Sequence, residues 1–138
     1  GDFTRLTDSP ILEFTDTDKH IEDPFLWYDE KRKKFCMLAK DDSKNGSNGI
    51  TGEWGAGFYA ESDDCIHFQT GENPKAYSRS VVWEDGRKNT QCNLERPSLL
   101  FDENGEPIYL YCASGDGDYP YAFKGRTYVV SIKLDKKQ

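Results

Sequence analysis

The same pattern of residues occurs twice in this chain, 73 positions apart. The first copy covers residues 22–39 (EDPFLWYDEKRKKFCMLA) and the second begins at residue 95 (ERPSLLFDENGEPIYLYC). Without a gap, Glu22 aligns with Glu95 and Pro24 with Pro97. Each copy consists of a carboxylate, a proline, an apolar stretch, an acidic turn and a second apolar stretch. Such a repeated antiparallel unit, with a carboxylate at one end, is typical of the blades that surround a polar funnel in a β-propeller.

Composition narrows the class of protein further. With 138 residues the chain is one domain or part of a larger one. Apolar residues make up only 36% of it, whereas aromatic residues make up 14%, a balance that favours a β-protein with polar loops and sugar-stacking surfaces. The net charge of −7 argues against nucleic acids and anionic membranes as partners. No apolar run approaches the roughly 18 residues of a membrane span.

The four cysteines do not predict a metal site. Cys36, Cys65, Cys92 and Cys112 show no CxxC spacing, so we expect no zinc. Cys36 and Cys112 lie in apolar stretches, which predicts free, buried thiols.

Strand patterns dominate the chain, and no amphipathic helix or glycine-rich phosphate loop is evident. The predicted class is all-β, a single partial propeller domain over residues 1–138. Within it, residues 1–20 end a preceding blade, with an outer strand at 6–14, residues 21–70 form one blade and residues 94–134 the next. The predicted strands are 25–28, 35–39, 57–62 and 66–68 in the first of these two blades, and 99–101, 107–112 and 127–134 in the second. Residues 41–55 are expected to form a long loop.

Five short motifs resemble a known family: EDPFLW at 22–27, LERP at 94–97, GFYAES at 57–62, DENG at 102–105 and VVSIKL at 129–134. They are similar to motifs of the five-bladed β-propeller glycoside hydrolases of family 43 and their relatives in families 32 and 117. The resemblance covers about residues 20–134. It implies that the chain is the C-terminal part of such a propeller, about two of its blades.

The resemblance also implies roles for two carboxylates. These families cleave glycosidic bonds with carboxylates from the inner strands of different blades. Asp23 corresponds to the aspartate that orients the site and tunes the acid, and Glu95 to the catalytic acid. The base has no clear counterpart, since Asp2 and Asp8 lack the right context. A structural interpretation is open for both residues: Asp23 caps the start of a strand, and Glu95 with Arg96 forms an ion pair that closes the blade.

Four further residues are candidates for substrate binding: Glu22, His20, Arg96 and Trp54. Trp54 lies among glycines on the long loop, which predicts an exposed platform for a sugar ring, whereas Trp27 is expected in the core. No cofactor is predicted. The one motif that could suggest a structural Ca²⁺ is the loop 116–118 (DGD), which matches the spacing of a calcium-binding loop only loosely.

Two functions from different classes follow. The first is a glycoside hydrolase, or a C-terminal fragment of one, acting on a polysaccharide or oligosaccharide. The alternative is a non-catalytic carbohydrate-binding propeller fragment that is completed by oligomerisation or by missing N-terminal blades. Two blades alone would leave apolar sheet faces exposed. The resemblance favours a secreted or periplasmic location.

Overall fold

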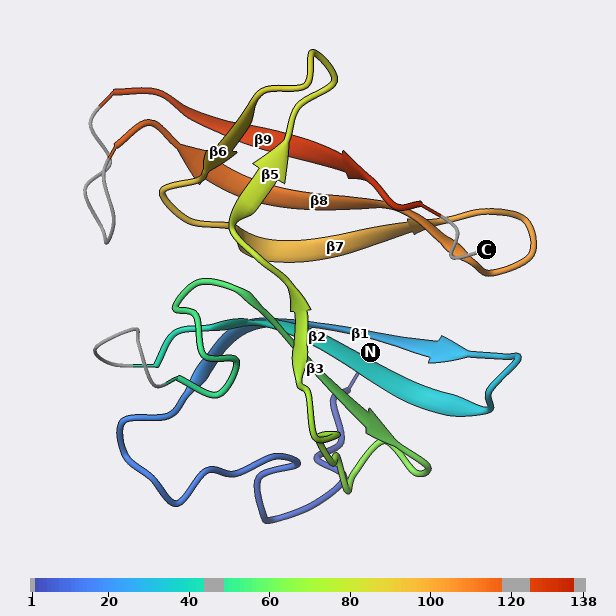
Figure 1. The fold of residues 1–138 in the computed structure, drawn as a ribbon. Helices are drawn as coiled ribbons and strands as arrows, with labels where there is room; N and C mark the ends of the chain where they lie inside the picture. The colour runs from blue at the N-terminus through green and yellow to red at the C-terminus, as the bar shows by residue number, and fades with distance from the viewer. Residues whose placement is uncertain (1, 44–48, 118–124, 136–138) are drawn as a thin grey trace.

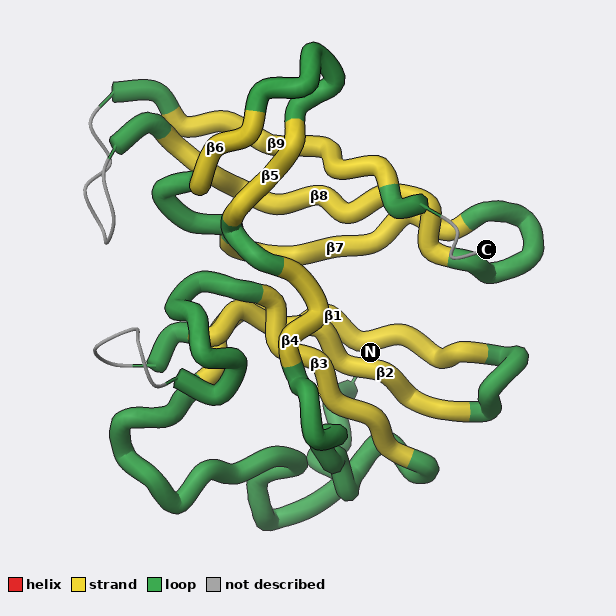
Figure 2. Tube along the Cα trace, viewed as in Figure 1, coloured by secondary structure: helices red, strands yellow, loops and turns green. Residues whose placement is uncertain are grey.

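The computed structural model describes residues 2–43, 49–117 and 125–135, and these are all strand, turn and loop (Figure 2). Three antiparallel sheets follow one another along the chain (Figure 1). The first contains β1 (Ile21–Asp29), β2 (Lys34–Asp41), β3 (Gly57–Ser62) and β4 (Lys75–Tyr77) in that order, the second is the hairpin of β5 (Ser80–Val82) and β6 (Lys88–Thr90), and the third contains β7 (Glu95–Phe101), β8 (Pro107–Gly115) and β9 (Thr127–Lys133). The predicted all-β class is confirmed.

The sequence repeat is also a structural repeat. In the first sheet Phe25 is the cross-strand partner of Leu38, and in the third sheet Ser98 is the partner of Tyr111, 73 residues further on for both members. We call residues 21–77 the first unit and residues 95–133 the second. Their turns are built alike, because Asp29 and Asp102 each accept two backbone N–H bonds within the turn that they begin.

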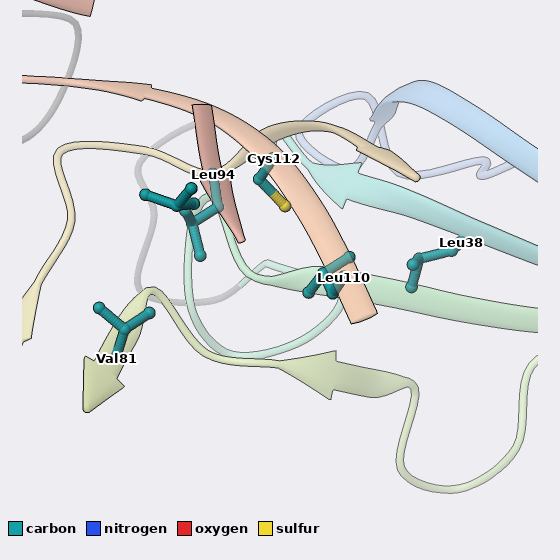
Figure 3. Close-up of a cluster of buried hydrophobic side chains, with 6 residues drawn as sticks. Leu38, Val81, Leu94, Leu110 and Cys112 are labelled. Carbon is teal, nitrogen blue, oxygen red and sulfur yellow. The ribbon is translucent and has the colours of Figure 1, made fainter. Parts of the chain in front are cut away.

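The two units meet along β1, β2 and β7, and the β5–β6 hairpin lies over β8 and β9 (Figure 1). Leu38 from the first unit joins Val81, Leu94, Leu110, Cys112 and Val130 in one buried cluster. Figure 3 labels five of these side chains, which come from β2, from β5, from the residue before β7 and, for Leu110 and Cys112, from β8. Trp27, half-buried, packs on this cluster and contacts the ring of Phe101 with 6.1 Å between centroids. It was expected in the core; it packs against the core cluster and is itself partly buried.

The opposite face of the first sheet has a core of its own. Met37, Ala39, Phe58, Ala60 and Phe68 are buried there. Residues 11–14, from the N-terminal segment, pack on them. This segment therefore covers the outer face of the first unit.

Two predicted strands are wrong. Residues 66–68 form no strand; only an isolated bridge joins Glu61 to Gln69. The fourth strand of the first sheet is β4, because the chain turns through Asp64, whose carboxylate accepts the N–H groups of Ile66 and His67 and thus keeps them out of a strand ladder. The strand expected at residues 6–14 is also absent, since residues 2–20 are irregular. They pack through side chains and not through a ladder.

No helix in the described part of the chain is long and apolar enough to cross a membrane. The free state predicted for Cys36 and Cys112 is confirmed, as both are buried and unbonded to another cysteine.

Candidate functional site

A buried lysine lies where the two units meet. Lys40, near the end of β2, is 1% exposed, and its Nζ lies 2.9 Å from Asp42 Oδ1, 3.2 Å from Glu95 Oε1 and 3.5 Å from Glu22 Oε2. We call these four residues the Lys40 cluster. Burial, the largest influence, lowers the pKa of Lys40, but the hydrogen bonds and charges of Asp42 and Glu95 outweigh it and raise that pKa above its ordinary value. Lys40 is therefore a permanent cation at neutral pH.

The repeat explains why one lysine binds two glutamates. Glu22 is the cross-strand partner of Lys40 on β1, whereas its counterpart Glu95 is the partner of Ala113 on β8. Alanine offers no cation, so Glu95 reaches across to Lys40 in the other unit. The glutamates that the sequence aligns are thus brought together in space.

Both units carry a β-bulge immediately after this glutamate. The register shifts between Glu22 and Phe25 and again between Glu95 and Ser98. The first extra residue is Asp23 in one unit and Arg96 in the other, with φ of 53° and 50°, a left-handed conformation that non-glycine residues rarely adopt. The following proline lacks an N–H, and a bulge is a place in a strand where none is needed. The Asp-Pro and Arg-Pro motifs therefore encode bulges that redirect the side chains at the start of each strand.

Around Glu95 the structure gathers hydrogen-bond donors. Besides Lys40, Asn93 donates from Nδ2 to Glu95 Oε1 at 3.0 Å and Arg96 donates from Nη1 to Oε2 at 3.2 Å. The predicted Glu95–Arg96 ion pair is therefore present. Glu95 is held as an acceptor from three sides.

His20 and Trp54 also belong to this site, but in different ways. The His20 ring nitrogen Nε2 lies 3.1 Å from Asp42 Oδ2 at the partly exposed rim. Trp54 was expected to be an exposed platform, and this prediction is wrong, since it is 3% exposed and the Lys40 Nζ lies over its ring at 4.8 Å. Arg79 also lies over the Trp54 ring, at 5.7 Å, so the indole is buried beneath two cations.

Asp23 lies beside this cluster and not within it. It is half-buried, and among the described residues the structure gives its carboxylate no hydrogen bond, so the proposed capping role has no support there. Its charge contributes, after burial and Cys112, to raising the pKa of Tyr77. The Tyr77 hydroxyl donates to the Leu94 carbonyl at 3.4 Å, one residue before Glu95. Asp23 therefore lies near the Glu95 backbone with its own oxygens available.

Sequence reasoning missed Lys40, Asp42 and Asn93. In the sequence, the charged pair Lys40-Asp41 ends an apolar stretch and is followed by a second aspartate. This pattern is typical of a solvated loop. Asp41 has a structural role: it is fully buried and accepts from the backbone N–H groups of Ser43 and Thr51 at 3.1 and 2.8 Å. It shapes the loop that carries Trp54.

No group of three or more metal-ligating side chains with metal-site geometry occurs in the described ranges. For the loop 116–118, Asp116 binds Arg126 through Oδ2 at 3.0 Å, and Asp118 lies outside the described residues.

Comparison of the chain with protein-family models, with curated proteins and with solved structures found no match. Function must therefore be inferred from the residues of the Lys40 cluster and from the repeat that positions them.

Proposed function

We propose that the chain is part of a five-bladed β-propeller glycoside hydrolase, with its two units as successive blades. The observation that carries the proposal is that the first strands of both units, β1 and β7, lie next to each other and bring Glu22 and Glu95 to one buried lysine. Inner strands that present carboxylates to a common centre would line the axis of a propeller. The centre combines acidic groups, an exposed guanidinium and a half-exposed imidazole, groups that suit recognition of sugar hydroxyls.

In this proposal Asp23 orients the substrate and tunes the acid, and Glu95 is the acid. Glycoside hydrolysis needs two carboxylates in different surroundings. The two residues meet this need in part: Glu95 is held by three donors, whereas Asp23 has no such donors in the described part of the chain. A base would have to come from a second copy of the chain, so the hydrolase proposal expects turnover where copies associate.

The contacts of Glu95 favour a second candidate function, carbohydrate binding without turnover. An acid must present a proton to the leaving oxygen, but Glu95 is surrounded by the donors Lys40, Asn93 and Arg96. A carboxylate held in this way is suited to accept hydrogen bonds from sugar hydroxyl groups. Both candidates place a sugar at the same residues.

The two are separated by assaying turnover and binding together. The chain would be tested on aryl xylosides and arabinofuranosides and on oligosaccharides, alongside Asp23→Ala, Glu95→Gln and the exposed turn variant Glu103→Gln as a charge-matched control. The hydrolase proposal expects turnover that both site variants lose and the control keeps. Saturable binding without turnover, lost in the same two variants, would support the binding function instead. Absence of both turnover and binding would contradict both.

A further inference from the structure

A second group of aromatic and polar side chains lies away from the Lys40 cluster, where the β5–β6 hairpin meets the start of β9 (Figure 1). A shallow depression there is lined by Trp83, Arg87, Asn89, Arg126, Thr127 and Tyr128. None of these belongs to the Lys40 cluster. We call it the Trp83 depression.

A buried glutamine holds the lining side chains in place. Gln91 donates from Nε2 to Asn89 Oδ1 at 3.0 Å, and its Oε1 accepts from the Tyr128 hydroxyl at 3.2 Å. Asn89 Oδ1 also accepts the Trp83 indole N–H at 2.6 Å. Trp83 and Tyr128 pack against the main hydrophobic cluster. Two aromatic side chains and one amide are thus fixed before any ligand arrives, which reduces the entropy lost on binding.

Two arginines at the rim are anchored in the same manner. Arg87 donates from Nε to Asp85 Oδ2 at 2.6 Å, and Arg126 donates from Nε to Asp116 Oδ2 at 3.0 Å. Each aspartate therefore holds its guanidinium through Nε. Within the described ranges neither arginine donates a hydrogen bond from a terminal Nη group, and both side chains are largely exposed. Terminal Nη groups on an anchored guanidinium form the planar fork that binds a carboxylate or sulfate.

These features define the class of ligand. Aromatic rings with a fixed amide suit a pyranose ring, whose apolar face stacks while its hydroxyls form hydrogen bonds. The aspartates offset the arginine charges, so an anion would be recognised by directed hydrogen bonds more than by net positive charge. We propose that the Trp83 depression is a second carbohydrate site that takes a sugar ring carrying a carboxylate or sulfate group. The proposal goes beyond hydrolysis at the Lys40 cluster and does not depend on it.

The test is an NMR titration of the full chain, following the Trp83 indole N–H, with methyl glucuronide, glucose 6-sulfate, methyl glucoside and inorganic sulfate. We expect the two anionic sugars to bind at least tenfold more tightly than the glucoside, as one charged hydrogen-bond pair allows. Inorganic sulfate should bind more weakly than either. Equal affinities for glucuronide and glucoside, tighter binding of free sulfate, or no binding of any probe would overturn the proposal.

Variants assign the contacts. Arg126→Gln, on an exposed side chain, should reduce affinity for the anionic sugars by at least fivefold and leave the glucoside unchanged. Trp83→Ala, followed through the backbone N–H of Thr127 in the same depression, should weaken the binding of all three sugars. Arg5→Gln removes the same charge elsewhere and should have no effect; an equal loss in that control would contradict the assignment. Asp23→Ala should leave this binding intact, so failure here and failure of the proposed function can be told apart.

Discussion

Lys40 is buried on all sides, and its charge is balanced by carboxylates from both units. Replacing it with methionine removes the buried cation that Asp42 and Glu95 share and leaves them the more exposed His20 and Arg96 as partners. Removing one partner of a buried charge network costs about 3–5 kcal/mol, so Lys40→Met should lower the free energy of unfolding in urea by about that amount. Glu22 is half exposed, and Glu22→Gln should cost less than about 1 kcal/mol. Equal stability of Lys40→Met and the wild type would show that the cluster does not hold the units together.

Cys112 predicts how stability depends on alkaline pH. Burial raises the pKa of its thiol from 9.0 to about 11. Between these values the unfolded chain loses the proton while the folded chain keeps it, so the stabilisation is complete below pH 9 and is lost as pH rises toward 11. Two pKa units correspond to about 3 kcal/mol. The free energy of unfolding, measured from pH 8 to pH 11, should therefore decrease more steeply with pH for the wild type than for Cys112→Ala. An equal decrease with pH in the two proteins would contradict this prediction.

At the scale of elements, the paired bulges are strained at equivalent positions. Glycine adopts positive φ without the steric cost borne by other residues. Asp23→Gly and Arg96→Gly should therefore each raise the free energy of unfolding by about 0.5–1 kcal/mol. This is the gain from relieved strain minus the cost of the greater entropy of the unfolded chain. Arg96→Val, with a β-branched side chain, should lower it. Thermal unfolding of the three variants tests this; destabilisation by both glycines would mean that the bulge conformation is not strained.

The same bulge variants separate stability from function. If Asp23 acts on a sugar, Asp23→Gly should gain stability while losing turnover or binding. Backbone strain that lowers stability is commonly retained at functional sites. A variant that gained stability and kept all activity would place Asp23 outside the site.

Local patterns predicted most elements but not the contacts between them. The hairpins of both units and β3 follow from apolar stretches bounded by turn residues, which act over a few residues. A short fourth strand was expected at 66–68, after the turn at 62–65. Instead, Asp64 accepts the N–H groups of Ile66 and His67, and β4 is the fourth strand of the sheet. The repeat predicted that Glu22 and Glu95 share a site. Nothing local could show that Lys40 would serve both or that Trp54 would be buried, since each depends on chain segments distant in sequence.

At the scale of the whole molecule, the two units are covered unequally. One face of the first unit packs on the second, and its other face is covered by residues 11–14. In the second unit, Leu110, Cys112 and Val130 face the first. Side chains alternate along a strand, so Leu100, Tyr109, Tyr111 and Val129 lie on the opposite face, where Leu100 and Val129 are exposed and the two tyrosine rings lie 6.3 Å apart. Among described residues this face has no covering segment. This face also carries Ser98, Ser131 and Lys133, but a repeat that exposes large apolar side chains on its terminal face is expected to be covered by another unit.

This asymmetry predicts self-association of the isolated chain. Apolar residues on an open sheet face are driven to bury against a second copy, so sedimentation velocity over a concentration series should show a rising average mass. Val129→Glu should weaken that association at least tenfold, since a carboxylate would be buried at the contact. Leu6→Glu is a matched control, because Leu6 is 73% exposed and Val129 70%, yet Leu6 lies in the N-terminal segment and outside the second unit. A constant monomer mass at every concentration, or equal weakening by both substitutions, would show that the open face is not where copies meet.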